Sequence, residues 1–392
     1  MYGDLWFEDY VKKGTDIWFA AGNYNGIYKF DTINRKVKRI ATFPCESIAK
    51  SWAFRKVGLW KENLLFLPAY ADAVYLYDME YGEFDRIDIL DEEELSEYQE
   101  KCKFQCFEMY GDWLYLIGHE YHGIIKVNLT SRQVEKIKKF PDEAFISNIE
   151  PGKPCFGTEM VAENNIIYIT CISSNKVLML DMKNDSIKVI EVGNDKNKYN
   201  GICKIGNAYY LKICDNGNIV RWEYGNEDCR EIELKFDAHF YDRKLCQTKN
   251  YIWVFSYISN EIFRIDKNNF NIIKIQANYP RNSMMLVFCE ETQDGIYFVN
   301  MYDGEWHFLR EDGTDENLHF SLKEPDSAKI MKQFVQENRF KVWKNMRENG
   351  VATIEALLLK VNETEHKAEN KLYVDYGKVI HDAVAGRGNI SV

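Results

Sequence analysis

The sequence predicts an all-β repeat fold followed by an α-helical extension. Aromatic residues are abundant, with 9 Trp, 25 Tyr and 23 Phe in 392 residues, and aromatic side chains favour strands. Short apolar runs recur at a regular interval along most of the chain, as in stacked structural repeats. Near residue 323 the apolar spacing changes to that of helices. These observations divide the chain into a repeat domain, residues 1–322, and a C-terminal extension, residues 323–392.

Each repeat has two apolar runs joined by a polar turn, and the second run usually ends in Asp, Asn or another polar residue. A third run follows after a short turn, and the seventh copy takes 318–322 as this last run. A further run precedes the pair, as at 5–7, 52–57, 104–109 and 284–288, so each unit is expected to have four strands. The paired central runs of the seven copies fall at 16–31, 63–78, 113–128, 166–181, 208–223, 251–266 and 295–310.

The end of each central pair recurs at intervals of 42–53 residues, which with several short strands per unit is typical of β-propeller blades. The pattern resembles the diverse propellers of the YVTN, quinoprotein-like, NHL and Kelch-like groups, as a diverged bacterial member. The resemblance implies a seven-bladed β-propeller of four-stranded blades over residues 1–322. The repeated Gly-His and Trp-Asp pairs of WD40 blades and the paired glycines of Kelch blades are absent, so the resemblance implies a fold rather than an activity.

Charge and cysteine usage narrow the class of protein. The net charge of −11 argues against nucleic-acid binding by phosphate neutralisation. No apolar stretch approaches the roughly 20 residues of a membrane span, and the acidic start at residues 1–9 does not resemble a signal peptide. The ten cysteines are scattered without a Cys-x-x-Cys pair, so a disulfide framework is not expected. We therefore expect a cytoplasmic protein without membrane insertion.

The loops at one end of the predicted blades are candidates for ligand binding. Because strand directions alternate, the loop between the second and third strands should share a face with the connection to the next blade, and such loops often carry function. Aromatic faces, amides and acids on that face would suit a polar ligand such as a glycan or a peptide. The candidates are Tyr24, Asn25, Tyr70, Asp72, Tyr121, Tyr257 and Tyr302 in loops, with Arg55, Arg243 and Arg281 on or near inner strands. The alternative interpretation is that Asn and Asp serve tight turns and that the arginines belong to a salt-bridge network.

His119 and His122, which flank Glu120 and Tyr121, are the candidate acid–base residues, together with Glu159 on an inner strand. The two histidines lack the helical spacing of a zinc motif, so we expect neither a metal nor a cofactor. Nucleotide-binding and serine-hydrolase motifs are also absent.

The C-terminal extension shows helical apolar spacing, for example Ile354, Leu357, Leu358 and Val361. We expect it to pack on the propeller, on a second copy or on a partner protein, because so short a segment buries its apolar faces poorly alone. The sequence favours a non-catalytic binding or scaffold protein that recognises a polar ligand on the loop-rich face. The alternative is a propeller lyase or hydrolase that uses acid–base residues at the same face, since fold alone does not decide between the two.

Overall fold

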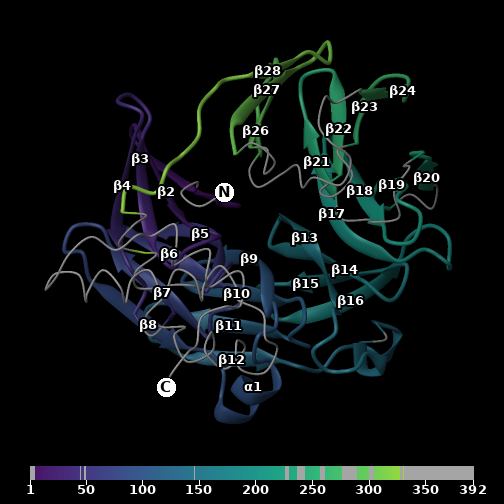
Figure 1. Ribbon diagram of the computed structural model, residues 1–392. Helices are drawn as coiled ribbons and strands as arrows, with labels where there is room; N and C mark the ends of the chain where they lie inside the picture. Colours follow the sequence, from purple (N-terminus) through teal and green to yellow (C-terminus); the bar gives the residue numbers. More distant parts are fainter. Residues whose placement is uncertain are drawn as a thin grey trace, which may run out of the picture.

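The computed structural model shows the arrangement of the strands (Figure 1). It describes residues 5–326 except 45, 48–49, 145, 226–228, 236–242, 257–260, 276–288 and 300–303, and it also describes Ile330. The described strands form seven four-stranded antiparallel sheets, each built from four strands that are consecutive in the chain. This confirms the predicted seven-bladed propeller. The expected helices of the extension lie outside the described residues, apart from the single position Ile330.

The first four blades contain the following elements: β1 (Val11–Lys13), β2 (Asp16–Ala20), β3 (Ile27–Asp31) and β4 (Lys36–Ala41); β5 (Phe54–Trp60), β6 (Asn63–Pro68), β7 (Ala73–Asp78) and β8 (Phe84–Asp88); β9 (Phe104–Tyr110), β10 (Trp113–Gly118), β11 (Ile124–Asn128) and β12 (Val134–Ile137); β13 (Phe156–Glu163), β14 (Ile166–Cys171), β15 (Lys176–Asp181) and β16 (Ser186–Glu191). The helix α1 (Glu92–Glu97) and the 3-10 turns η1 (Asp142–Ala144) and η2 (Ile146–Asn148) lie in connections between blades.

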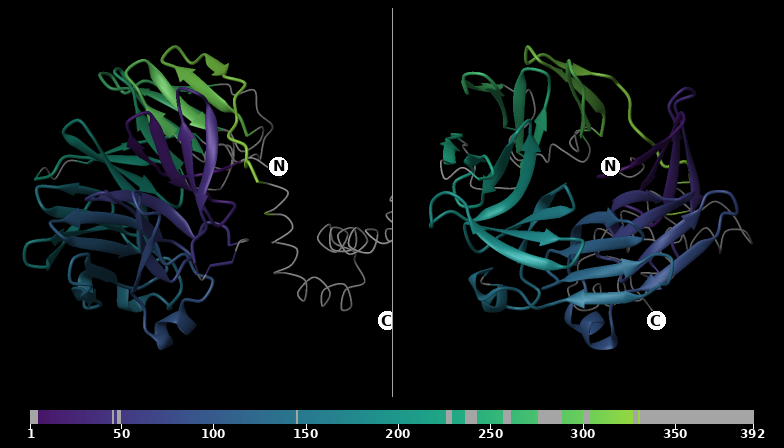
Figure 2. Two further views of the ribbon diagram at one scale, coloured as in Figure 1. Left: turned by 90° about the vertical axis from the view of Figure 1, so that its left-hand side faces the viewer. Right: turned by 180° about the vertical axis from the view of Figure 1, so that it is seen from behind.

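The last three blades contain β17 (Tyr199–Ile205), β18 (Ala208–Ile213), β19 (Ile219–Trp222) and β20 (Cys229–Ile232); β21 (Arg243–Gln247), β22 (Tyr251–Ser256), β23 (Ile262–Asp266) and β24 (Ile272–Ile275); β25 (Cys289–Glu291), β26 (Gly295–Val299), β27 (Trp306–Arg310) and β28 (Asp315–Asn317). In the side and rear views the blades surround a common axis (Figure 2). The first strands lie closest to this axis, because β13 packs on β9 and on β17, and β5 packs on β2 and on β9.

The recurring Asp or Asn at the end of the third strand has a local structural role. The side chain of Asp31 accepts hydrogen bonds from the backbone N–H groups of Ile33 and Asn34, at 2.9 and 3.0 Å. The same arrangement is found at Asp78, Asn128 and Asp266. A short side chain that bonds the backbone two or three residues ahead stabilises a tight turn, so this repeat position starts the hairpin to the outer strand.

The hydrophobic core is divided among the seven interfaces between neighbouring blades. One cluster of described residues, for example, joins Leu65 and Val74 of the second blade to Leu114 and Ile125 of the third. Corresponding clusters join the other neighbouring blades around the ring. Many of the abundant aromatic residues lie in these interfaces, including the fully buried Trp253, so they stabilise the stack of blades.

The ring closes through a segment that follows the last strand, and this corrects two sequence expectations. The run 318–322 is not the outer strand of the seventh blade, since β28 is Asp315–Asn317. The chain leaves β28 and runs along the first blade (Figure 1), where the Leu5 N–H donates a 2.8 Å hydrogen bond to the Leu322 carbonyl. Nor is the run 5–7 the inner strand of the first blade; β1 is Val11–Lys13, and Leu5 and Phe7 pack with Leu322 instead.

The connection before the third blade forms a short acidic helix. Asp91 caps α1, with a capping box to Glu94. Glu94 is buried, and its carboxylate accepts a hydrogen bond from the Tyr121 hydroxyl at 3.0 Å and pairs with Lys136 and Lys138. The helix is therefore fastened to the third blade rather than merely solvated.

Candidate ligand pocket at the bulged ends of four blades

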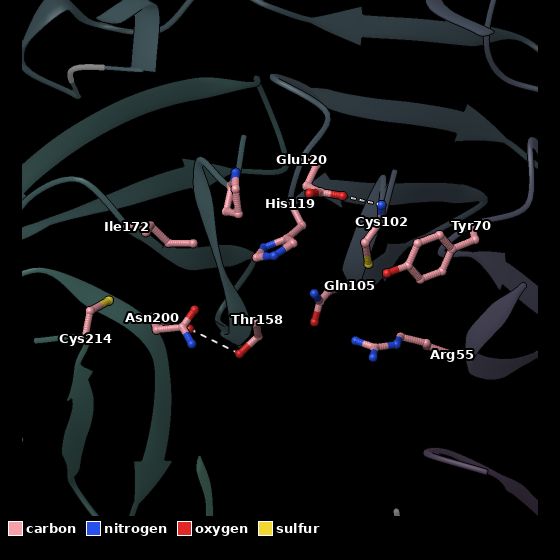
Figure 3. A pocket seen from close by; sticks show the side chains of 11 residues that line it. Arg55, Tyr70, Cys102, Gln105, His119, Glu120, Thr158, Ile172, Asn200 and Cys214 are labelled. Atoms are coloured by element: carbon pink, nitrogen blue, oxygen red, sulfur yellow. Dashed lines mark hydrogen bonds between the residues drawn. The ribbon is translucent and has the colours of Figure 1, made fainter. Parts of the chain in front are cut away.

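A pocket of about 450 Å³ opens where the axis-facing ends of the second to fifth blades meet (Figure 3). Its lining combines a cation, a carboxylate, an imidazole, amides, hydroxyls and thiols. The lining residues are Arg55, Tyr70, Cys102, Gln105, His119, Glu120, Pro154, Thr158, Ile172, Asn200 and Cys214. The pocket is thus mainly polar, with the size of a small-molecule site.

The four inner strands contribute to the pocket through β-bulges. One-residue bulges occur at Arg55 of β5, Gln105 of β9 and Asn200 of β17. The residues before and after each of them pair with two residues that are adjacent on the neighbouring strand, so the residue between has no pairing partner in the ladder. Thr158 lies in the longer irregularity between Phe156 and Met160 of β13. A bulge leaves an extra residue outside the ladder and redirects its side chain, and bulges are frequent beside functional sites. Four successive blades therefore use the same device to line one pocket.

Loops from the same end of the blades complete the lining. The Ala69 carbonyl accepts the Lys103 N–H at 2.8 Å, and the His119 carbonyl accepts the Cys155 N–H at 2.8 Å. Such bonds join the end of a second strand to the connection into the next blade. They show that the two kinds of loop share a face, as the alternation of strand directions predicts.

His119 has a defined orientation in the pocket wall. Its Nδ1 lies 2.8 Å from the Phe156 carbonyl, and a carbonyl only accepts, so Nδ1 carries the hydrogen. In the neutral ring, Nε2 is then the basic nitrogen. Glu120 beside it accepts a hydrogen bond from the Cys102 N–H, which fixes the carboxylate at the rim (Figure 3).

Cys102 is not an activated thiol. It is buried, and burial raises its pKa to about 11, although Arg55 opposes this effect. The reactive form of a cysteine is the thiolate, so at neutral pH Cys102 is a protonated lining group. Tyr70 lies next to it, and burial likewise raises the pKa of the Tyr70 hydroxyl.

Beneath the pocket floor lies an ion cluster around Glu159, which follows Thr158 on β13. Lys212 Nζ and Lys244 Nζ each lie 3.1 Å from the Glu159 carboxylate. Burial alone would raise the pKa of Glu159, but the two ammonium groups together hold it at about 2. Glu159 is therefore ionised and engaged in a salt-bridge network, and it is not placed as a general acid.

Several residues that the sequence singled out do not reach the pocket. Tyr121 is a correction, because its ring is fully buried between blades and its hydroxyl donates to Glu94. Asn25 is also buried, and its amide bonds the backbone of Phe43 and Glu46, so it shapes a loop. Tyr24 packs at the edge of the ring-closing core.

Asp72 pairs with Lys103 at 3.0 Å, and Lys103 Nζ also donates to the Tyr70 carbonyl at 3.1 Å. His122 bonds the Lys153 carbonyl at 2.8 Å. Arg55, Tyr70 and His119 are the sequence-predicted residues that line the pocket. Tyr257, Arg281 and Tyr302 lie outside the described residues, as does the side chain of Arg243.

The sequence reasoning missed Gln105, Thr158 and Asn200. Each occupies the second or third position of its inner strand, as Arg55 does. An alignment of the four repeats on their inner strands would place these four residues at equivalent or adjacent positions. Nothing in the sequence marks the bulges that direct them inward.

The fold and the pocket define the class as a seven-bladed β-propeller with a polar site at one end of its axis. No family model matches the sequence, and no curated protein matches it. Among solved structures, the chain is similar to virginiamycin B lyase from Staphylococcus aureus, with a TM-score of 0.55, 10% identity, and coverage of 76% of this chain and 92% of the lyase.

Two further structures show the same architecture. A candidate 6-phosphogluconolactonase from Bacteroides uniformis gives a TM-score of 0.52 at 11% identity, covering 82% of this chain and 96% of that one. The extracellular domain of a candidate one-component system from B. thetaiotaomicron gives 0.52 at 10% identity, covering 76% of this chain and 37% of that one. At these identities the likeness shows the fold alone, and the three proteins differ in function.

Two further properties concern metal binding and membrane insertion. Within the described ranges, no group of three or more His, Cys, Asp or Glu side chains is gathered for a metal ion. Among the same residues, no helix has the length and apolarity to cross a membrane. The eight cysteines whose side chains are described carry thiols rather than disulfides.

Proposed function

We propose that this chain is a binding protein for a small polar ligand, such as a short glycan or peptide segment, held in the pocket between the second and fifth blades. The observation that carries the proposal is the set of bulges in four successive inner strands, which place Arg55, Gln105, Thr158 and Asn200 in one pocket. Bulges of this kind weaken the strand ladders, so their alignment on a single cavity supports a site for a ligand.

The side chains of the pocket favour binding over catalysis. Amides and a hydroxyl form hydrogen bonds with a neutral polar group, and Tyr70 offers a ring face for stacking. Cys102 is held as a thiol, and Glu159 is committed to two lysines beneath the floor. The described cysteines carry thiols rather than disulfides, which supports a reducing compartment such as the cytoplasm.

The second candidate function is that of a lyase or hydrolase, and one observation favours it. The Phe156 carbonyl fixes Nδ1 of His119 as the donor, so Nε2 is the atom that would accept a proton as general base. In that case His119 would remove a proton from a substrate bound over the bulge residues.

A ligand screen with matched variants tests the proposal. Thermal shift with mono- and disaccharides, dipeptides, nucleotides and small organic acids should reveal a stabilising ligand. Gln105→Leu should weaken its affinity by about 3- to 10-fold, the loss of one hydrogen bond. Gln133→Leu, on an exposed outer hairpin, should leave affinity unchanged.

The same experiment separates the two candidates. If the bound compound is recovered unchanged by mass spectrometry, the binding function stands. If the compound is converted and His119→Ala abolishes conversion while retaining binding, the chain is an enzyme and the binding proposal is wrong.

A further inference from the structure

We infer that the ligand of this pocket carries a protonated amino group, which the carboxylate of Glu120 binds at the rim. The inference rests on the proposed function and adds the chemical class of the ligand. It is carried by the fixed position of this carboxylate in the pocket wall and by the charges that surround it.

Glu120 is held in place by both its backbone and its side chain. Its N–H donates to the Cys102 carbonyl at 3.1 Å, and its carboxylate accepts the Cys102 N–H. The adjacent His119 N–H donates to the Lys103 carbonyl at 2.7 Å, so the loop after β10 is joined to the chain that enters β9. Figure 3 shows the Glu120 carboxylate above the imidazole of His119, beside Cys102. A carboxylate positioned in advance loses little conformational freedom when a ligand binds.

The buried Tyr121 anchors the same loop from the other side. Its hydroxyl donates to Glu94 at 3.0 Å, and the Gly118 N–H closes the loop by donating to the Gly123 carbonyl at 3.0 Å. A Cβ at Gly118 would lie 1.9 Å from the Tyr121 carbonyl oxygen, so the loop is as tight as a glycine allows. With Tyr121 packed between the blades, the residue before it, Glu120, lines the pocket.

The Glu120 carboxylate has no ion-pair partner in the part of the chain that the structure describes. The Cys102 N–H is the group that bonds its side chain there. Lys101, next to Cys102, extends along Gly152, where a Cβ would lie 3.2 Å from Cε of the lysine, and the adjacent Glu100 carries the opposite charge. A carboxylate that the protein does not balance favours a cationic ligand group, because hydrogen bonds between two charged groups are the strongest.

The other described charges around the pocket occur in equal numbers of the two signs. At the rim, Lys103 pairs with Asp72 at 3.0 Å and Lys198 with Asp215 at 3.8 Å. Under the floor lie Arg55, Lys56, Lys212 and Lys244 against Glu8, Asp9, Glu159 and Glu291. Among these described groups, the charge of Glu120 is therefore the one that remains for a ligand.

The charge of Glu120 also acts inside the pocket. Burial raises the pKa of the Cys102 thiol to about 11, and Glu120 adds to this increase although Arg55 opposes it. Burial raises the pKa of the Tyr70 hydroxyl as well, and Glu120 again contributes in the same direction. The face of an aromatic ring such as that of Tyr70 attracts cations, so carboxylate and ring both favour an ammonium group on this side of the pocket.

Isothermal titration with amines and their hydroxy analogues tests the inference. The amines are glycyl-glycine amide, alanyl-alanine amide and glucosamine. In the matched controls, glycolyl-glycine amide, lactyl-alanine amide and glucose, a hydroxyl replaces the amino group. Near neutral pH most of an amino group with a pKa of about 7.7–8.0 is protonated. At least one amine should therefore bind 10-fold or more tightly than its analogue.

The probes also distinguish the two sources of an amino group. A preference for the dipeptide amides would identify the amino terminus of a peptide, and a preference for glucosamine would identify an amino sugar. Equal binding of amines and hydroxy analogues, or binding of none of the amines, would overturn the inference.

Glu120→Gln removes the charge and keeps an oxygen for the Cys102 N–H. It should weaken binding of the amine by about 10- to 100-fold, the range for a hydrogen bond to a charged group, and change binding of the hydroxy analogue by less than about 3-fold. Glu150→Gln is the matched control, because Glu150 is exposed in the connection before the fourth blade and does not line the pocket; it should leave binding of the amine unchanged. Equal losses for amine and analogue in Glu120→Gln, or no loss for either, would refute the role of Glu120.

If Glu120→Gln does not fold, as judged by its melting transition, the comparison of amine and hydroxy analogue on the unaltered protein still decides. The failure of this inference differs from failure of the proposed function. A neutral ligand whose affinity depends on Gln105 but not on Glu120 would leave the binding site intact and remove only its specificity for an amine.

Discussion

The closure of the ring provides the most direct test of the fold energetics. Leu322 is 2% exposed and packs with Leu5, Phe7 and Val299, so it joins the chain after β28 to the first blade. Replacing a buried leucine by alanine costs about 2–5 kcal/mol. The roughly 290 residues that the structure describes have an unfolding entropy near 0.6 kcal/mol/K, so a loss of about 3 kcal/mol should lower Tm by roughly 5 °C.

Differential scanning calorimetry of Leu322→Ala measures this shift. Leu59→Ala is the matched control, because Leu59 is 48% exposed, and its Tm should change by less than about 1 °C. A Leu5→Ala and Leu322→Ala double-mutant cycle should show coupling, since the two residues share one cluster. If Leu322→Ala melts like the unaltered protein, residues 318–322 do not close the ring.

Three further predictions concern single residues. The pKa of Glu159 is depressed from 4.5 to about 2, so its pairing contributes stability that is complete above pH 4.5 and is lost as pH falls toward 2. Denaturant unfolding of Glu159→Gln should lack that contribution, about 3 kcal/mol, and an identical pH slope would contradict it. Gly118→Ala would place a Cβ 1.9 Å from the Tyr121 carbonyl oxygen and should destabilise by more than about 3 kcal/mol, whereas Gly58→Ala, with 3.4 Å contacts, should cost less than half as much in the same melts. Tyr121→Phe should cost about 1–3 kcal/mol because it leaves buried Glu94 without one donor, and unchanged stability would show that this bond is dispensable.

The hairpins of the blades could be predicted from the sequence because their determinants are local. Alternating apolar residues define the second and third strands, and a terminal Asp such as Asp31 or Asp266 bonds the turn that follows. The seven central pairs were therefore located correctly. The first strand of the first blade and the last strand of the seventh blade were not located correctly. Residues 5–7 and 318–322 were assigned to them because they contain apolar side chains, but these two segments pack against each other and do not extend a sheet.

The pocket could be predicted only in part. The expected loop or inner-strand positions were enough to select Arg55, Tyr70 and His119, which line the pocket. The bulges could not be predicted, because they depend on the register between strands and leave no mark in the composition. Tyr121 was misassigned because its loop position resembles that of Tyr70, while Glu94, 27 residues earlier, provides a buried partner for its hydroxyl. The ion pair of Lys212 with Glu159 depends on the space that Gly201 leaves in the adjacent strand, a relation that only the fold reveals.

Because every blade uses four consecutive strands, the order of synthesis has a consequence for the newborn chain. Blades two to seven can each pack on the preceding blade as they emerge, but the apolar face formed by Leu5, Phe7 and Phe19 receives its cover only when Leu322 has been made. At ribosomal speeds of 5–20 residues per second, that interval is roughly 15–60 s. The first blade therefore carries an uncovered apolar face throughout most of translation, which makes the N-terminal segment the place where chaperone binding or aggregation of nascent chains would begin.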